Sequence, residues 1–205
     1  MNKIGIIMAS YSRPERLSII KEQLDKQTYK DFKFIVHDNT VNNEGSAVRF
    51  KEVLKTKCNP IIFIDDDESL EPDFVEYMYE RYKEYPDAIQ GWFTRIFVGD
   101  TYWGSIPYNE EDTEVDYVGT GGMILDRKIF DEEPILQNIP EEFVKVEDLY
   151  LSYLARKRGQ KLIAVKPHIK IEVDGKDQYT RLGNYKELAF NKLRELGWQL
   201  IREKK

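Results

Sequence analysis

Short apolar runs alternate with amphipathic helical segments between Ile4 and Lys83, and this alternation constrains the fold more than any other feature. The apolar runs predict buried strands, and the spacing of Leu17, Ile20 and Leu24 after the first run predicts a helix. Such alternation is typical of βαβ units and a parallel sheet. Right-handed crossovers bring the carboxyl ends of these strands to one edge of the sheet, where open α/β sheets bind ligands.

The predicted strands of this part are Ile4–Ala9, Phe32–His37 and Ile61–Ile64. The predicted helices begin near Ser12, with Glu15 at capping-box spacing, and cover Gly45–Lys57 and Glu71–Lys83.

The second half of the chain has a different pattern. The segment Ala88–Trp103 is rich in β-branched and aromatic residues, which predicts irregular or antiparallel strands. Lys145–Gly159 predicts a helix that is apolar nearly all round in its middle and is therefore sandwiched between other elements. A strand at Leu162–Val165 and a terminal helix at Tyr185–Glu203 follow, and the predicted buried positions of that helix are Leu188, Leu193, Leu196 and Leu200.

Size and composition indicate one soluble domain, because the chain has 205 residues of which 33% are charged and 41% hydrophobic. A net charge of −6 disfavours a broad surface for nucleic acid or membranes. Cys58 is the only cysteine, so no disulfide forms within the chain, which fits a reducing compartment. No apolar stretch reaches transmembrane length, and Ile4–Ala9 is too short for a signal peptide. We therefore expect a cytoplasmic protein without a transmembrane segment.

Three consecutive aspartates directly follow the apolar run Ile61–Ile64. Carboxylates at the end of a buried strand repel one another unless a cation lies among them. In an extended segment Asp65 and Asp67 point to one side and Asp66 to the other, so Asp65 and Asp67 can share a cation. Oxygen ligands of this kind suit Mg²⁺ or Mn²⁺ and leave positions open for substrate phosphates. The competing interpretation is a solvated acidic loop.

The acidic segment also has some likeness to two other motifs. A calcium loop of the EF-hand type requires glycine at its sixth position, where this chain has Leu70, and Pro72 intrudes, so we reject it. The spacing also resembles the D-x-D-x-[T/S] start of haloacid-dehalogenase-type phosphatases, in which Asp65 would be a covalent nucleophile. That motif normally follows the first strand of its domain, whereas here it follows the third, so this alternative stays open as the weaker one.

Glu147 and Asp148 stand at the predicted start of the sandwiched helix. Because the helix dipole stabilises a carboxylate there, a capping role is one interpretation. The other is a general base that deprotonates an acceptor hydroxyl. Neighbouring helix positions lie about a quarter turn apart, so usually only one of the two carboxylates can face a site.

Two further features have both a structural and a functional interpretation. The segment Gly119-Thr120-Gly121-Gly122 is either a turn between strands or a place where the backbone approaches a ligand, and it is not a P-loop because no Gly-Lys-Ser/Thr follows. His168 follows the predicted strand Leu162–Val165, and it is either a structural histidine or a metal ligand.

These segments, in this order, resemble the motifs of family-2-type glycosyltransferases of the GT-A fold. Ala9 to Glu15 (ASYSRPE) is similar to the opening T-Y-N-R-P-E segment of that family, and Val36 to Thr40 (VHDNT) to its V-D-D-G-S turn. Asn43-Glu44-Gly45 with Arg49 resembles its N-x-G…R segment. The other similar segments are Ile64 to Asp67 for the D-x-D motif, Gly121 to Ile124 for the acceptor-side G-G turn, and Glu147 to Leu149 for the E-D motif.

The resemblance covers about Ile4 to His168 and departs from the family pattern at His37 and Asn39. It implies a Rossmann-like α/β/α sandwich with a mixed, mainly parallel sheet. It also implies one domain over residues 1–205, with a nucleotide-binding half (1–86), an acceptor-binding half (87–183) and a C-terminal helix (184–205).

The resemblance further implies a hexosyltransferase-like enzyme that depends on Mn²⁺ or Mg²⁺, uses a nucleotide-diphospho-sugar such as a UDP- or GDP-sugar, and transfers the sugar with inversion. Asp148 would be the base, with Glu147 as the fallback, and Asp67, Asp65 and His168 would bind the metal. The acceptor side would include Trp92, Gly121 and Gly122. The donor would contact Ala9, Ser10, Tyr11, Arg13, Asp38, Arg49, Asp65 and Asp66.

The acceptor stays open at this point: a glycan, a lipid-linked sugar, a protein or a modified nucleic acid would each offer a nucleophile. The alternatives to a transferase are a non-catalytic nucleotide-sugar or carbohydrate-binding module, a D-x-D phosphatase and a nucleotidyltransferase. A binding module needs no base, so the presence of both D-x-D and E-D disfavours it.

Overall fold

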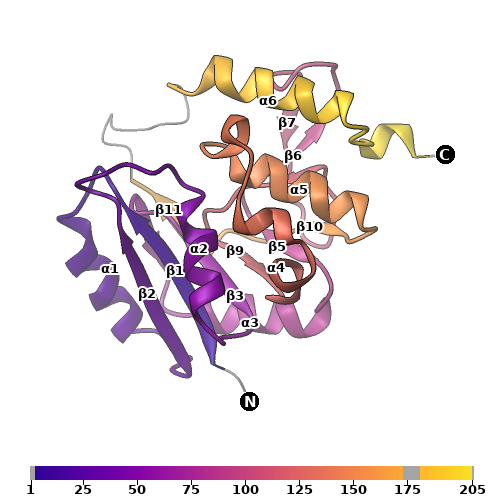
Figure 1. Cartoon of the computed structure of the whole chain (residues 1–205). Coiled ribbons are helices and arrows are strands. Elements are labelled where there is room, and N and C mark those ends of the chain that lie inside the picture. Colours follow the sequence, from indigo (N-terminus) through magenta and orange to yellow (C-terminus); the bar gives the residue numbers. More distant parts are fainter. Residues whose placement is uncertain (1–2, 173–180, 205) are drawn as a thin grey trace.

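The structure is a computed structural model that describes residues 3–172 and 181–204 (Figure 1). Its centre is a six-stranded sheet in the order β10-β5-β9-β3-β1-β2. The strands are β1 (Ile4–Ser10), β2 (Phe32–Asp38), β3 (Ile61–Ile64), β5 (Ile89–Gly91), β9 (Met123–Leu125) and β10 (Leu162–Ala164). Strand β9 runs antiparallel to both of its neighbours, whereas the other pairs are parallel. The predicted mixed, mainly parallel sheet is confirmed.

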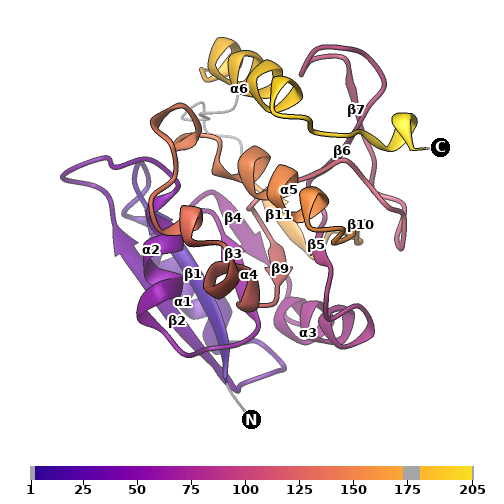
Figure 2. The same ribbon diagram turned by 45° about the vertical axis from the view of Figure 1, so that its right-hand side comes forward.

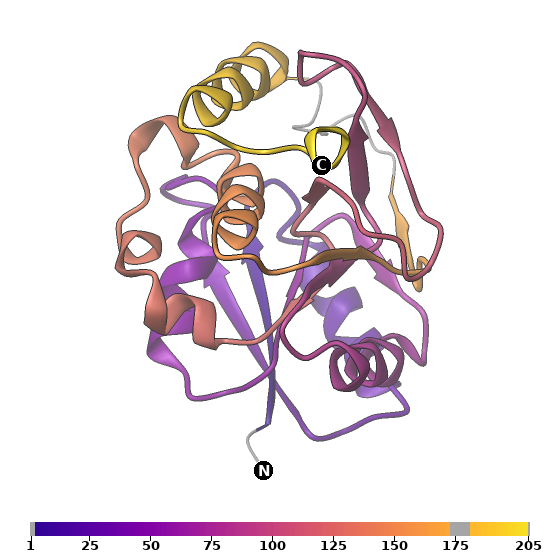
Figure 3. The same ribbon diagram turned by 90° about the vertical axis from the view of Figure 1, so that its right-hand side faces the viewer.

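Helices cover both faces of this sheet, because each central strand is apolar on both sides. Ile6 and Ile62 pack with α1 (Arg16–Asp25) and α3 (Phe74–Glu84), while Ile7 and Phe63 belong to a second cluster on the other face. The second face is covered by α2 (Val48–Lys55), α4 (Lys128–Glu132) and α5 (Glu147–Lys157). Figures 2 and 3 show α3 and α4 on opposite sides of the sheet. This is the α/β/α sandwich that the sequence predicts.

Two small antiparallel sheets lie beside the central one. The first joins β4 (Glu68–Leu70), which directly follows the aspartates, to β11 (Ile169–Ile171). The second has the order β7-β6-β8 and consists of β6 (Thr94–Phe97), β7 (Ser105–Pro107) and β8 (Tyr117–Val118). The prediction of antiparallel strands in this part is confirmed, whereas the pairing of β4 with β11 was not predicted.

The remaining elements of the described residues are three short 3-10 helices and α6 (Gly183–Glu195), which lies across the end of the molecule opposite the N-terminus (Figure 1). The 3-10 helices are η1 (Pro134–Gln137), η2 (Glu141–Phe143) and η3 (Ile201–Glu203). In the described residues no helix is both long and apolar enough to cross a membrane.

The start of α1 differs from the sequence prediction. The helix begins at Arg16 with Glu15 as N-cap, and no side-chain capping bond forms, so the predicted capping box of Ser12 and Glu15 is wrong. A turn precedes the helix, since the N–H of Arg16 donates to the carbonyl of Arg13 at 3.0 Å. That turn brings Arg13 to the aspartates instead.

The terminal helix is shorter than predicted. Helix α6 ends at Glu195, and Gly197 has a φ of +91°, a left-handed conformation that terminates helices. Two predicted buried positions are wrong, because Leu188 is 69% exposed and Leu196 is 50% exposed. The buried side chains of α6 include Ala189, Phe190 and the predicted Leu193, and Leu200 is buried beyond the helix.

Candidate active site

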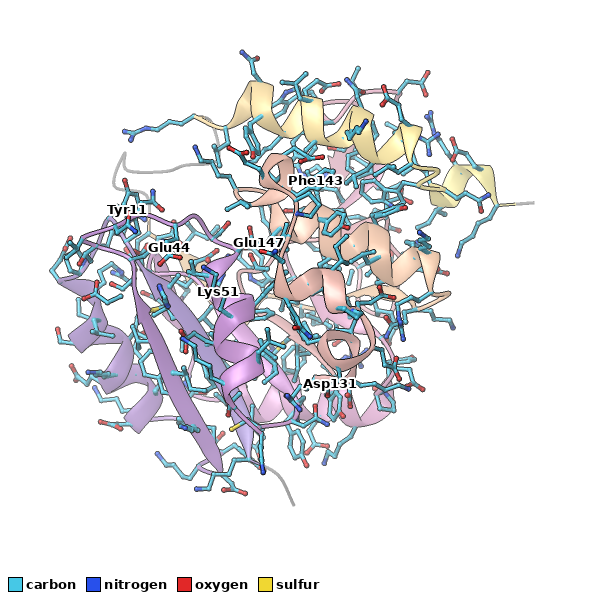
Figure 4. All side chains as sticks on the ribbon, in the orientation of Figure 1. Tyr11, Glu44, Lys51, Asp131, Phe143 and Glu147 are labelled. Carbon is cyan, nitrogen blue, oxygen red and sulfur yellow. The ribbon has the colours of Figure 1, made fainter. Side chains whose placement is uncertain are left out.

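A cavity of about 570 Å³ opens at the carboxyl ends of β1 and β3. Its walls come from the loop after β1, the acidic turn after β3, the start of α2, the glycine segment and the start of α5. In Figure 4 Tyr11 marks the first of these walls and Glu147 the last. The predicted residues that line it are Ala9, Tyr11, Arg13, Arg49, Asp65, Asp66, Asp67, Trp92, Gly121, Glu147 and Asp148. Residues from distant segments therefore meet where the α/β topology predicts a ligand.

Four predicted site residues are not among the described residues that line this cavity. Ser10 is buried in β1, and its carbonyl accepts the N–H of Asn39 at 2.8 Å. Asp38 is exposed, and its Oδ1 accepts the N–H and the hydroxyl of Thr40. Gly122 donates its N–H to Phe63 in the neighbouring strand.

His168 is the fourth, and the structure gives a physical reason for its position. Its ring stacks on Tyr77 of α3 with centroids 3.9 Å apart, and its Nδ1 lies 3.1 Å from Asp73 Oδ1. These contacts direct His168 toward α3 rather than toward the aspartates. The structure therefore places His168 against α3, and its metal-ligand role stays a prediction.

Asp66 and Asp67 lie in a turn rather than in an extended segment, so the extended backbone assumed for the predicted alternation is not observed. Asp66 is buried, and its two oxygens accept the N–H of Tyr11 at 2.9 Å and Arg13 Nη1 at 3.0 Å. It thus fixes the loop after β1 to the turn after β3. Asp67 lies 3.5 Å from the same guanidinium. Burial and the neighbouring Asp65 raise the pKa of Asp67 to about 6, although Arg13 opposes this shift.

Glu68 is a fourth carboxylate of this turn that the sequence analysis did not single out. It is 2% exposed, and its Oε2 accepts the N–H of Asp65 at 2.9 Å. Burial, followed by the charge of Asp65, raises the pKa of Glu68 well above its usual value. Gly121 packs against it so closely that a Cβ there would overlap Glu68 Oε1 and lie 3.0 Å from Asp65 Oδ2. This close approach explains one glycine of the glycine segment.

Arg49 of α2 connects the acidic turn to the start of α5. Its Nη1 donates to Asp65 Oδ1 at 2.5 Å, and its Nη2 donates to Thr120 and to Glu147 Oε1, each at 2.7 Å. The other oxygen of Glu147 accepts the hydroxyl of Ser46. Glu147 is 1% exposed, and burial raises its pKa to about 7 even though Arg49 lowers it. Both oxygens of Glu147 are therefore engaged by the protein.

Asp148 differs from its neighbour because it is only partly buried where it lines the cavity. Its Oδ2 accepts the hydroxyl of Tyr117 at 2.5 Å, and its Oδ1 accepts the N–H of Leu149 at 2.8 Å. Burial raises its pKa, while the bond from Tyr117 and the nearby charge of Lys186 act in the opposite direction. An oriented carboxylate with a raised pKa, in a cavity, has the properties of a general base.

The acidic turn has the chemistry of a site for a hard divalent cation. Asp65 and Asp67 offer carboxylate oxygens, and the charge of Asp65 raises the cost of ionising Asp67. Within the described ranges, no group of three or more His, Cys, Asp or Glu side chains is arranged to hold an ion alone. The residues fit Mg²⁺ or Mn²⁺ held by one or two carboxylates and completed by ligand phosphates.

The family model described as "Glycosyl transferase family 2" matches residues 5–135 of the chain, which is more than half of its length. The chain belongs to glycosyl transferase family 2. The predicted family is thereby confirmed, and it supports the expectation of a glycosyltransferase. No curated protein sequence matches the chain.

Solved structures of Staphylococcus aureus TarS share the fold. One covers 94% of this chain and 42% of TarS, with a TM-score of 0.60 and 14% identity. The match to TarS residues 1–349 in complex with UDP covers 80% of this chain and 58% of the TarS chain, with a TM-score of 0.59 and 15% identity. The match to the same TarS residues in complex with UDP-GlcNAc covers 85% of this chain and 60% of the TarS chain, with a TM-score of 0.60 and 15% identity. The chain thus spans less than two thirds of each, and at these identities the likeness confirms the GT-A fold alone.

Proposed function

We propose that the chain transfers a sugar from a nucleotide-diphospho-sugar to an acceptor hydroxyl, with inversion and with Mn²⁺ or Mg²⁺. The observation that carries this proposal is that Asp148 and the acidic turn Asp65–Glu68 line one cavity, linked through Arg49 and Glu147. A diphosphate needs a cation site and an acceptor needs a base, and the cavity offers both chemistries. The TarS complexes with UDP and UDP-GlcNAc support a UDP-sugar as the donor.

On the donor side, the backbone of Ala9–Tyr11 would hold the nucleoside, with Arg13 and Asp66 keeping that loop in position. Asp67 and Asp65 would hold the cation. When bound, a divalent cation supplies Lewis-acid stabilisation of the charge that develops on the departing diphosphate. Arg49 adds a fixed positive charge beside Asp65.

On the acceptor side, Asp148 would take the hydroxyl proton while the acceptor oxygen bonds to the anomeric carbon. The bond from that carbon to the diphosphate oxygen breaks, and its electron pair leaves with the diphosphate. Tyr117 fixes one oxygen of Asp148, which leaves the carboxylate oriented for this transfer. Glu147 is disfavoured as the base because it is 1% exposed and forms an ion pair with Arg49, whereas Asp148 is only partly buried.

The acceptor wall includes Trp92, whose indole Nε1 is buried and has no hydrogen-bond partner among the described residues. Since this atom has almost no accessible surface, an acceptor would meet another part of the Trp92 side chain, beside Gly121 in the cavity wall. A glycan, a lipid-linked sugar, a protein or a modified nucleic acid all remain candidate acceptors.

The test combines binding and turnover. The melting temperature is measured with UDP, UDP-GlcNAc and GDP-sugars, with and without Mn²⁺, and UDP release is then measured with candidate acceptors. We expect a stabilisation by UDP-sugar that requires Mn²⁺, and turnover that Asp148→Asn reduces by about 10²- to 10⁴-fold. Glu142→Gln, an exposed acid just before α5, is the matched control and should keep full turnover.

Other outcomes identify the alternatives. Donor binding without turnover on any acceptor would indicate a binding module. Phosphate release from simple esters through a phospho-aspartate at Asp65 would indicate a phosphatase. Pyrophosphate release from a nucleoside triphosphate would indicate a nucleotidyltransferase. Full turnover by Asp148→Asn would exclude Asp148 as the base.

A further inference from the structure

The glycine segment Gly119-Thr120-Gly121-Gly122 connects β8 to β9 and lies between the base and the acidic turn. Its first three residues line the cavity. The hydroxyl of Thr120 accepts a hydrogen bond from Arg49 Nη2 at 2.7 Å, which fixes the middle of the segment. The glycines on either side of Thr120 face different groups, Tyr117 on the side of the base and Glu68 on the side of the acidic turn.

Gly119 leaves room for the tyrosine that holds the base. A Cβ on Gly119 would lie 3.2 Å from the hydroxyl oxygen of Tyr117 and 2.6 Å from a ring carbon of Phe93. Tyr117 is 3% exposed, and its hydroxyl donates to Asp148 Oδ2 at 2.5 Å. A side chain at Gly119 would therefore press on the hydroxyl that orients Asp148.

Gly121 has the same relation to the acidic turn. A Cβ on Gly121 would overlap Glu68 Oε1 and lie 3.0 Å from Asp65 Oδ2. Glu68 is 2% exposed, and its Oε2 accepts the N–H of Asp65 at 2.9 Å. In return, the N–H of Glu68 donates to the carbonyl of Asp65 at 3.4 Å. Glu68 thus holds the backbone of Asp65 through a reciprocal pair of hydrogen bonds.

The conformation of the backbone explains only one of these glycines. Gly122 has a φ of +67°, a left-handed conformation that favours glycine. Gly119 and Gly121 have no positive φ, so other residues could adopt their backbone conformation. The lack of a side chain at these two positions is instead required by the groups that they face.

Tyr117 is one of several groups that act on Asp148. Lys186 of α6 and Arg49 of α2 act on it with positive charges, and its neighbour Glu147 with a negative one. Burial raises the pKa of Asp148, and the hydrogen bond from Tyr117 is the largest of the effects that lower it. A variant that removes only this hydroxyl leaves the other charges in place, so it isolates the effect of Tyr117.

We propose that the glycine segment positions the base and the cation site relative to each other, with Tyr117 and Glu68 as its two positioning residues. Tyr117 acts through Asp148, which it keeps oriented and ionised. Glu68 acts through Asp65, whose backbone it holds in the turn. This inference rests on the proposed function, in which Asp148 is the base and Asp65 helps to hold the cation. Both parts are tested without turnover, so a failure of the inference is distinguishable from a failure of the transfer activity.

The first part is tested by titrating the carboxyl carbon of Asp148 in the ¹³C-labelled chain, where its signal is assigned by its loss in Asp148→Asn. In Tyr117→Phe we expect the titration midpoint of Asp148 to move up by about one pH unit, because the ionised form loses a hydrogen-bond donor. Tyr153→Phe is the matched control. Tyr153 lies on the same helix as Asp148 but donates to the carbonyl of Leu196, so this variant should leave the midpoint unchanged.

The second part is tested by the binding of Mn²⁺ in the presence of UDP, measured by electron paramagnetic resonance of the free ion. Glu68→Met removes the acceptor of the Asp65 N–H and should weaken binding by about tenfold or more. Glu68→Gln keeps an oxygen acceptor and should restore most of the affinity. If Glu68→Met does not fold, Glu68→Asp replaces it, because the shorter side chain withdraws its carboxyl group from Asp65. Glu76→Met, which removes an exposed acceptor of the Thr28 hydroxyl, is the matched control.

Each part can fail separately. An unchanged midpoint of Asp148 in Tyr117→Phe would overturn the proposal, and so would equal Mn²⁺ affinities of Glu68→Met and the wild type. Equal weakening by Glu68→Gln and Glu68→Met would show that Glu68 acts through its charge, which also overturns a positioning role. No binding of Mn²⁺ by the wild type would instead refute the cation site of the proposed function, and the role of Glu68 with it.

Discussion

Arg49 Nη1 lies 2.5 Å from Asp65 Oδ1, and this contact ties the strand that carries the D-x-D motif to the rest of the cavity. The same guanidinium binds Glu147, so one buried cation serves two carboxylates from segments far apart in the sequence. Burial alone would lower the pKa of Arg49, but the charges of Asp65 and Glu147 raise the pKa by more than burial lowers it. Arg49 therefore stays charged. The start of α5, and with it Asp148, is thereby held against the acidic turn.

Removing the charge of Arg49 should therefore destabilise the folded chain. We expect Arg49→Met to lower the free energy of unfolding by about 3–5 kcal/mol, because the buried carboxylate of Glu147 loses its counter-charge, as does the partly exposed carboxylate of Asp65. Urea denaturation measures this change. Lys51→Met is the control, since Lys51 lies on the same helix (Figure 4) but pairs with Glu44 at the surface, and it should cost at most about 1 kcal/mol. Equal losses in the two variants would refute the role of Arg49.

The pH dependence of stability should report Asp67. Its pKa is raised to about 6 in the folded chain, above the ordinary aspartate value, so the folded state binds the additional proton. Stability from this group is therefore complete below the ordinary pKa and is lost as the pH rises toward 6. Other carboxyl groups have lowered pKa values and change the stability in the opposite direction. The effect of Asp67 is therefore measured by comparing the wild type with a variant that lacks this carboxyl group.

Between pH 4 and pH 7, a range set by the ordinary carboxyl pKa and the raised ones, the metal-free wild type should lose stability relative to Asp67→Asn. Melting temperatures measured in parallel give this difference. Parallel curves for the two proteins would exclude a raised pKa of Asp67. Glu147, with a pKa of about 7, contributes in the same direction in both proteins and cancels.

The aspartates should differ in metal binding. We expect Asp67→Asn to remove most of the stabilisation by Mn²⁺ with UDP, because Asp67 lines the cavity and its contact with Arg13, at 3.5 Å, is longer than the arginine contacts of Asp65 and Asp66. Asp66→Asn should keep the metal effect, since Asp66 is occupied by Tyr11 and Arg13. It should instead destabilise the metal-free protein by about 1–3 kcal/mol through the loss of a charged acceptor. A reversed order of the two variants in a Mn²⁺ titration would contradict this assignment.

The sequence predicts those parts of the fold that depend on local patterns. The apolar run Ile61–Ile64 becomes β3 with the predicted bounds, because a fully buried strand must be apolar on both faces. The terminal helix is predicted less well, since leucines at Leu188 and Leu196 suggest burial that the packing of α6 does not provide. Which face of that helix is covered depends on Phe97, from a distant strand, and on Trp198, just beyond the helix, which both contact Phe190.

In the candidate site, too, the contacts between distant segments are not predictable from local sequence patterns. The D-x-D and E-D segments are recognisable alone, but Arg49 and Glu147 are 98 residues apart, and their contact depends on the fold that brings the start of α2 to the start of α5. The sequence does not single out Glu68, because a fourth acidic residue after three aspartates is typical of a solvated loop. The only sequence signal was Gly121, whose missing side chain makes room for that carboxyl group.

Gly121→Ala should therefore disturb the acidic turn. A Cβ at this position would overlap Glu68 Oε1, and because Glu68 is buried between Asp65 and Gly121 it has little room to shift. We expect a loss of about 1–3 kcal/mol in the free energy of unfolding, which is typical of overpacking. Glu68→Asp shortens the side chain by one methylene, so the double variant should lose less stability than the sum of the two single ones. Denaturation of all four proteins measures this coupling, and strict additivity would show that the contact between Gly121 and Glu68 does not constrain the turn.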